Sequence, residues 1–201
     1  NGHTAWGQLA MAGALLHVWN HGLFKSLLFL GAGSVIHACK TRIMSRMGGL
    51  WKKMPLTTVF FAIGAAAISG LPPLNGFVSE WLVYLGMLDA LTGHGIVAGT
   101  AVIPIVALAI TGALALACFA KVCGIVFLGA ARSEAASNAG EAPRSMLTAM
   151  AIPAMLCAII GACPVVFWPL IAPTLSSFNP EWKTPIQPES LSTLGAIHLG
   201  F

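Results

Sequence analysis

Four long stretches of this chain are nearly free of charged residues, and they limit the fold more than any other feature. They are Ala5–His37, Pro55–Leu88, Ile96–Leu128 and Met146–Ile171. Each exceeds the roughly 20 residues that a helix needs to cross a hydrocarbon core of about 30 Å. Because the runs lack the alternation of strands, and backbone groups in lipid must be paired internally, we expect an all-α polytopic membrane helix bundle. Only 8% of the residues are charged, against about 25% in soluble domains.

The second run is too long for one straight span, since a single helix of that length would extend over about 50 Å. Its centre reads LPPLNG, Leu71–Gly76. Pro72 and Pro73 remove backbone donors and block the preceding turn, while Asn75 can cap a helix that Gly76 opens. We predict two half-helices joined at membrane depth, an arrangement that in transporters commonly marks the ion site. An ordinary surface turn between two full spans is the alternative.

Basic residues indicate the orientation of the spans. The loop after the first run has no acidic residue and five basic ones: Lys40, Arg42, Arg46, Lys52 and Lys53. Link 89–95 has no Lys or Arg, whereas link 131–145 has Arg132 and Arg144. Cytoplasmic loops are enriched in Lys and Arg, so we expect a multi-pass protein of the plasma membrane with its Lys40–Lys53 loop in the cytoplasm. The net charge of +4 is therefore a topology marker and does not indicate nucleic acid as a partner.

Three ionisable residues lie in the first run at four-residue intervals: His17, His21 and Lys25. At 3.6 residues per turn they form a ladder along one helix face, about 6 Å apart, with Asn20 beside it. Ionisable groups at membrane depth are expensive and usually face the bundle interior or a water-filled cavity. Two imidazoles and an amine one turn apart suit proton transfer through one or two waters, so the ladder is a candidate proton relay.

Other interpretations of these residues stand beside the relay. His17 and His21 have the spacing of metal ligands, although no acidic or thiol partner lies nearby. Haem ligation needs a histidine on a facing helix, and no second span carries one. A hydrogen-bonded packing histidine is the simplest alternative for His17 alone. No CxxC pair, phosphate loop, nucleophile elbow or redox-cofactor motif is present, and we expect neither a metal nor a cofactor.

Two later runs each add an ionisable residue. Glu80 follows Gly76 by four residues, near the start of the second half-helix, where burial and the positive helix end act on a carboxylate in opposite directions. We expect Glu80 to load and release a proton, and the alternative is a Glu that faces solvent. Lys121 lies about two turns before the end of its run and can equally snorkel to the interface, so it is a secondary candidate.

Three segments, in order, resemble a known family. They read HVWNHGLFKSLLFLGAGSVIHA, MGGLWKKMP and ISGLPPLNGFVSEWL, and they lie within Leu15–Leu85. They resemble signatures of the antiporter-like proton-pumping membrane subunits of respiratory NADH:quinone oxidoreductase, multi-subunit cation/proton antiporters and energy-converting hydrogenases. The match is specific because several motifs occur in the right order at the right separation. The later ACFAKVCGIVFLGAARSEAA is similar, to about Met155, to the large membrane subunit of the hydrogenase-4 and formate hydrogenlyase branch.

The resemblance implies a role for each candidate residue. Lys25 would be the central proton-carrying residue of a half-channel, with His17 and His21 as its relay partners. Glu80 occupies the position after the Gly-Phe of the broken helix, which the family fills with Lys or Glu and uses as an exit-side proton site. The family has two inverted repeats of membrane helices. As a piece of a longer protein, this chain is expected to hold most of the end of the second repeat and the helices after it.

We therefore predict proton translocation by a subunit of a redox-driven complex, with no redox chemistry of its own. A Na⁺/H⁺ antiporter subunit is the main alternative, and a haem-binding membrane anchor is a more remote one. Expected partners are other membrane subunits, a peripheral hydrogenase or dehydrogenase arm, and the lipid bilayer. Along the chain we expect about four spans in 1–171, then in 172–201 a polar Pro-rich connector and the start of a further helix.

Overall fold

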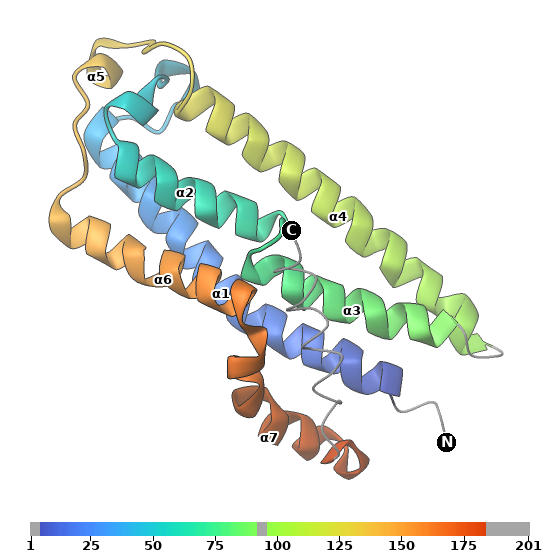
Figure 1. The fold of residues 1–201 in the computed structure, drawn as a ribbon. Coiled ribbons are helices and arrows are strands. Elements are labelled where there is room, and N and C mark those ends of the chain that lie inside the picture. The colour runs from blue at the N-terminus through green and yellow to red at the C-terminus, as the bar shows by residue number, and fades with distance from the viewer. Residues whose placement is uncertain (1–4, 92–95, 184–201) are drawn as a thin grey trace.

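The computed structural model describes residues 5–91 and 96–183, which fold into helices (Figure 1). The α-helices are α1 Ala5–Cys39, α2 Pro55–Ile68, α3 Asn75–Leu91, α4 Ile96–Val126, α5 Glu134–Ser137, α6 Arg144–Ala162 and α7 Trp168–Phe178. Short 3₁₀ helices cover Met44–Arg46, Leu50–Lys52, Pro164–Phe167 and Pro180–Lys183. No strand occurs among the described residues, which confirms the predicted all-α class.

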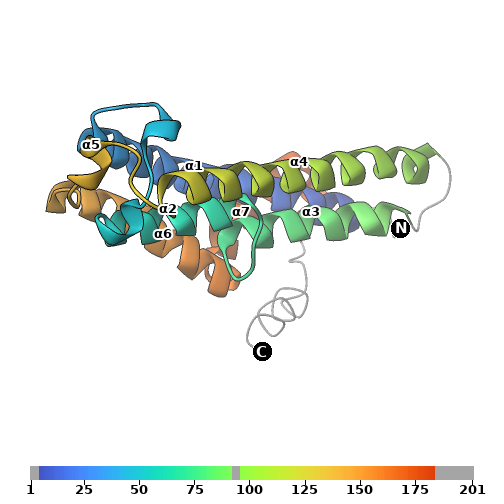
Figure 2. The same cartoon turned by 90° about the horizontal axis from the view of Figure 1, so that it is seen from above.

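Among the described residues, three segments are long and apolar enough to cross a membrane: Gly7–Cys39 in α1, Gly99–Val126 in α4, and α6. With 14 residues, α2 is about 21 Å long and too short to cross alone. Figures 1 and 2 show α2 and α3 following one another end to end along α1, with α4 returning beside α3. The two half-helices together therefore cover the length that α1 covers as one helix.

The break between α2 and α3 has a local cause in the sequence. The amide of Leu71 donates to the carbonyl of Ala66, 3.0 Å away, and Gly70 adopts a left-handed conformation with φ 63°, as residues that end helices commonly do. The two prolines after Leu71 cannot continue the helix. The break occupies 69–74 rather than Leu71–Gly76, because Asn75 and Gly76 already belong to the first turn of α3.

Glycines let the neighbouring helices close around the break. Gly76 packs so tightly against the carbonyl of Ala67 that no side chain fits there. From α6, Gly161 packs on the backbone of Leu74, and a Cβ at Gly161 would lie 2.7 Å from the Leu74 Cα. The break is thus held between α2, α3 and α6, beside the middle of α1 (Figure 1).

The fourth apolar run, Met146–Ile171, is not one helix. α6 ends at Ala162, and Cys163 is non-helical with φ −133° and ψ 64°. Pro164 has no amide hydrogen to continue the ladder, so the chain bends and forms α7 in a new direction (Figure 1). α7 continues across position 171, where we expected the polar connector to begin, and the predicted further helix lies outside the described residues.

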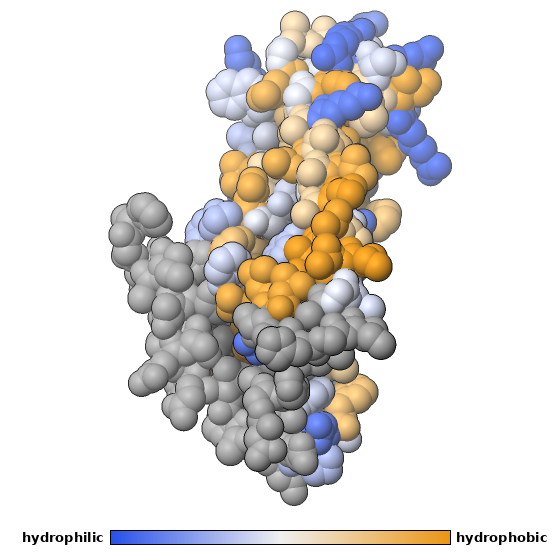
Figure 3. Space-filling model, turned by 90° about the vertical axis from the view of Figure 1, so that its right-hand side faces the viewer, coloured by the Kyte–Doolittle hydropathy of each residue, from blue (hydrophilic) through white to orange (hydrophobic). Residues whose placement is uncertain are grey.

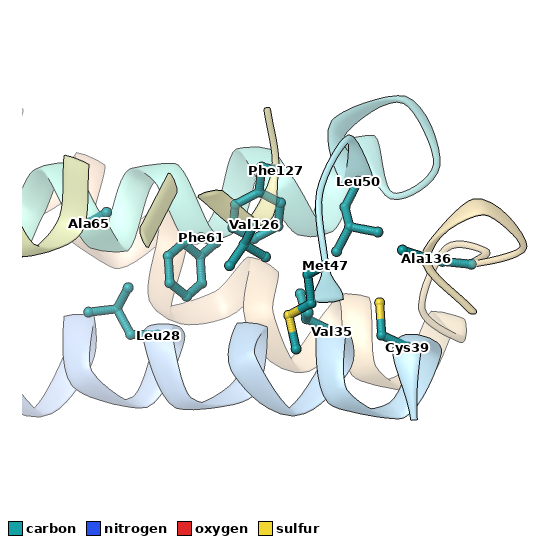
Figure 4. Packing of buried hydrophobic residues seen from close by; sticks show 11 residues of the cluster. Leu28, Val35, Cys39, Met47, Leu50, Phe61, Ala65, Val126, Phe127 and Ala136 are labelled. Carbon is teal, nitrogen blue, oxygen red and sulfur yellow. The ribbon is translucent and has the colours of Figure 1, made fainter. Parts of the chain in front are cut away.

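The loop after α1 folds back over the end of α4. Its amides at Gly49 and Trp51 donate to the carbonyls of Leu128 and Phe127, at 2.9 and 3.0 Å. Beneath it lies the largest buried cluster of the bundle, in which side chains of α1, α2, α4 and the loop converge (Figure 4). Its largest members are Leu28, Val35, Met47, Leu50, Phe61, Val126 and Phe127. The packing fixes the loop end of the molecule against three helices.

Candidate functional site

The histidine ladder lies on α1 as its spacing predicts. The rings of His17 and His21 have centroids 6.2 Å apart. The buried ring of Phe24 meets both at their edges, with centroids 6.0 and 5.4 Å away. His17 and Lys25 are half-buried and His21 is exposed. Because their centroids are 6.2 Å apart, the two imidazole rings are too far from each other for a direct hydrogen bond.

His17 is joined to the broken helix by a hydrogen bond that crosses from α1 to α3. Its Nδ1 lies 3.0 Å from the hydroxyl oxygen of Ser79. That hydroxyl is fully buried and lies 2.9 Å from the carbonyl oxygen of Gly76. A serine hydroxyl has one hydrogen and can also accept. Either Ser79 donates to Gly76 and accepts from a protonated Nδ1, or it donates to Nδ1, so its orientation is coupled to the protonation of His17.

A glycine on α1 explains why Ser79 reaches His17. Gly13 lies one turn before His17, on the same face. A Cβ at Gly13 would lie 2.7 Å from the amide nitrogen of Val83 and 2.9 Å from the carbonyl oxygen of Ser79. Since real Cβ atoms do not approach this closely, only glycine lets α3 pack against α1 at this distance.

Next to this contact, two buried asparagines bring polar groups into the bundle. The Asn20 amide donates to the carbonyl of Asn75 over 2.8 Å, and both residues are fully buried. Asn20 Oδ1 has no partner among the described residues. Asn75 Nδ2 and Oδ1 likewise have no hydrogen-bond partner among the described residues, and the thiol of Cys157 nearby is a weak partner. Ser69 Oγ, at the end of α2, is likewise buried and unpaired in the described part of the chain.

Glu80 faces the break. Its carboxylate lies against Gly70, where a Cβ would be 2.6 Å from Oε2. Glu80 is half-buried and, within the described residues, makes no hydrogen bond or ion pair. Ser79 and Glu80 point about 100° apart on α3, so Ser79 faces α1 while Glu80 faces the turn that ends α2.

The other sequence candidates lie outside this contact. Lys25 makes no hydrogen bond or ion pair with residues of the described ranges, and no contact joins it to Glu80. Lys121 is exposed on α4. Pro72 and Pro73 form the exposed outer side of the break. Ser79 was not predicted from the sequence as a site residue. The feature that could have indicated it is a hydroxyl side chain directly before Glu80 in the predicted second half-helix.

The alternatives of a metal or haem site concern the two histidines of the ladder. Nowhere in them do three or more His, Cys, Asp or Glu side chains gather to hold an ion. The histidines within the described ranges all lie on α1, so none of them faces His17 or His21 from another helix. Haem ligation between helices therefore has no support in this part of the chain.

The sequence of this chain is similar to sequences of known proteins. Residues 2–106 match the family described as NADH:quinone oxidoreductase/Mrp antiporter, TM. Hydrogenase-4 component B of Escherichia coli is 46% identical over 154 residues, 76% of this chain and 23% of that protein. Formate hydrogenlyase subunit 3 of Escherichia coli is 42% identical over 182 residues, 90% of this chain and 29% of that protein. The chain thus spans about a quarter of the length of these curated relatives.

A solved structure has a similar fold. The membrane-bound sulfane sulfur reductase, an archaeal respiratory membrane complex, contains a chain with a TM-score of 0.64 and 26% sequence identity. The similarity covers 78% of this chain and 24% of that one. The fold of most of this chain therefore recurs in a solved membrane complex.

Proposed function

We propose that this chain, which belongs to the NADH:quinone oxidoreductase/Mrp antiporter family, is part of a membrane subunit that translocates protons. The observation that carries the proposal is the hydrogen bond between His17 and Ser79. It connects a ladder of ionisable groups on α1 to a helix broken within the bundle, next to a carboxylate. In the complete protein this contact would form one section of a proton path from Lys25 to Glu80.

The proton enters this section on the α1 ladder. From Lys25 and His21 it reaches His17 through bridging water, because the imidazole rings are 6.2 Å apart. His17 then donates from Nδ1 to the Ser79 hydroxyl as that hydroxyl releases its own proton to a water between α1 and the break. The imidazole is left with the arriving proton on Nε2. The section resets when that proton moves to Nδ1 through water and the Ser79 hydroxyl turns back to the carbonyl of Gly76.

Water is the natural carrier between Ser79 and Glu80. Buried polar atoms nearly always have partners in protein or ordered water, and the oxygens of Asn20 and Ser69 have none in the described residues. Water at the break would satisfy them and would also reach the carboxylate of Glu80 beside Gly70. Glu80 is then the site that takes the proton from the break and passes it on.

In the complete protein we expect the energy for this path to come from other subunits. Electron transfer in a peripheral hydrogenase or dehydrogenase arm would shift charge along the membrane domain and change the hydration around Lys25. We place the Lys40–Lys53 loop in the cytoplasm and the protein in the plasma membrane of its cell. Lys121, exposed near the end of α4, is assigned to the membrane interface rather than to the path.

The test is the number of protons moved per electron pair by the assembled full-length complex in sealed vesicles. Lys25→Ala and Glu80→Gln should each abolish coupled proton movement and leave assembly intact, because each removes a group that carries the proton. Lys121→Gln is the matched control and should pump normally. Normal stoichiometry in the Lys25 or Glu80 variant would contradict the assignment, and proton movement that requires Na⁺ would favour an antiporter subunit.

A further inference from the structure

A small apolar cavity lies between α1, α2 and α4 beneath the loop that follows α1. Its volume is about 150 Å³. The main apolar side chains around it are Val35, Ile36, Phe61, Val122 and Val126. Several of them belong to the buried cluster of Figure 4. The cavity is therefore a notch in the packed loop end of the bundle, formed by helices that we treat as membrane-embedded.

One charged side chain, Arg42, lines this cavity. Arg42 is exposed and, within the described ranges, makes no hydrogen bond or ion pair. The surrounding loop adds four more basic residues and no acid over positions 40–53. A guanidinium next to an apolar cavity, in a loop of one charge sign, is complementary to a ligand that joins an anionic group to a hydrocarbon chain.

The same loop exposes apolar side chains among its charges. Ile43, Met44 and Trp51 are 51%, 41% and 49% exposed, and the ammonium of Lys52 lies 6.0 Å from the centre of the Trp51 ring. Basic residues mixed with Trp and aliphatic side chains are typical of the boundary between lipid headgroups and acyl chains. Figure 3 shows hydrophilic side chains gathered at one end of the molecule above a largely apolar surface.

We propose that this cavity binds one anionic phospholipid, with the phosphate on Arg42 and part of an acyl chain in the notch. Basic pockets between membrane helices recognise such headgroups, and a guanidinium can hold a phosphate through two parallel hydrogen bonds. The cavity holds only about five water volumes of roughly 30 Å³, so it accepts a few methylenes and leaves the headgroup outside. The inference rests on the loop end and is independent of the proton path.

The experiment is native mass spectrometry of the full-length protein, purified with its complex and mixed with phosphatidylglycerol or phosphatidylcholine of the same acyl chains. The wild type should retain one phosphatidylglycerol and no phosphatidylcholine. Arg42→Gln should weaken retention at least about tenfold, the effect of losing a charge-assisted hydrogen bond, while Arg42→Lys should weaken it less. Ala32→Met, which fills the cavity but keeps the charge, should also release the lipid.

The matched control is Lys53→Gln, because Lys53 is an exposed cation of the same loop that does not line the cavity. It should leave lipid retention unchanged. Equal losses in the Arg42 and Lys53 variants would overturn the proposal in favour of diffuse surface charge. Unchanged retention in Arg42→Gln, or equal retention of phosphatidylcholine, would overturn it as well. Inorganic phosphate that binds with undiminished affinity to Ala32→Met would show an anion site without a lipid.

Discussion

Removal of the Ser79 hydroxyl is the sharpest perturbation of the proposed path. Ser79→Ala deletes one side chain oxygen, which lies 3.0 Å from His17 Nδ1 and 2.9 Å from the Gly76 carbonyl oxygen. An unpaired buried polar group costs about 1–3 kcal/mol. Because His17 is only half-buried and water can reach its ring, we expect a loss of about 1 kcal/mol in unfolding free energy.

The effect of Ser79→Ala on transport should be much larger than its effect on stability. A positioned group that donates and accepts a proton contributes about 10²–10⁴ to the rate of a transfer step. We therefore expect the variant to pump at least about tenfold more slowly, measured as acidification of sealed vesicles that contain the full-length complex. Ser79→Thr keeps the hydroxyl and should retain most of the activity. Wild-type pumping in Ser79→Ala, with assembly unchanged, would refute the route through Ser79.

Two glycines give further predictions. Gly70→Ala places a Cβ 2.6 Å from Glu80 Oε2, at a residue with a left-handed φ of 63°. It should therefore lower the unfolding free energy by about 1–2 kcal/mol and reduce pumping. A stable variant with normal pumping would show that the position of the Glu80 carboxylate is not needed. Gly13→Val should force α3 away from α1 and reduce pumping. The control Gly33→Val, at an open position of α1, should leave pumping unchanged. Equal pumping in the two variants would contradict the need for close packing of α3 against α1. Thermal unfolding of the solubilised proteins checks the stability terms.

The sequence predicted the main elements of the fold because they depend on local chemistry. The long apolar runs predicted the membrane-spanning segments. Pro72 and Pro73 predicted the break between the two half-helices, whose bounds differ from the observed ones by two residues. The resemblance to antiporter-like membrane subunits, including the hydrogenase branch, is confirmed by the relatives that the chain matches. The bend at Cys163 was missed, although Pro164 after it was visible, because the apolar character of the run continues through it.

The candidate site could be predicted only in part. Periodicity places His17, His21 and Lys25 on one face of a helix, but it does not say which helix that face meets. The contact with Ser79 depends on the close approach that Gly13 allows, and the position of Glu80 depends on the space at Gly70. Both are properties of tertiary packing, which residue spacing along one helix does not encode. The roles of these residues in proton transfer stay a prediction.

The central claim is that Glu80 receives a proton that has passed His17 and Ser79. Infrared difference spectroscopy of the full-length complex during turnover measures it most directly, through the carbonyl stretch of a protonated carboxyl group. We predict a transient carboxyl band that is absent in Glu80→Gln and that rises more slowly in Ser79→Ala than in wild type. A band that persists in Glu80→Gln, or that rises at the wild-type rate without the Ser79 hydroxyl, would contradict the proposed path.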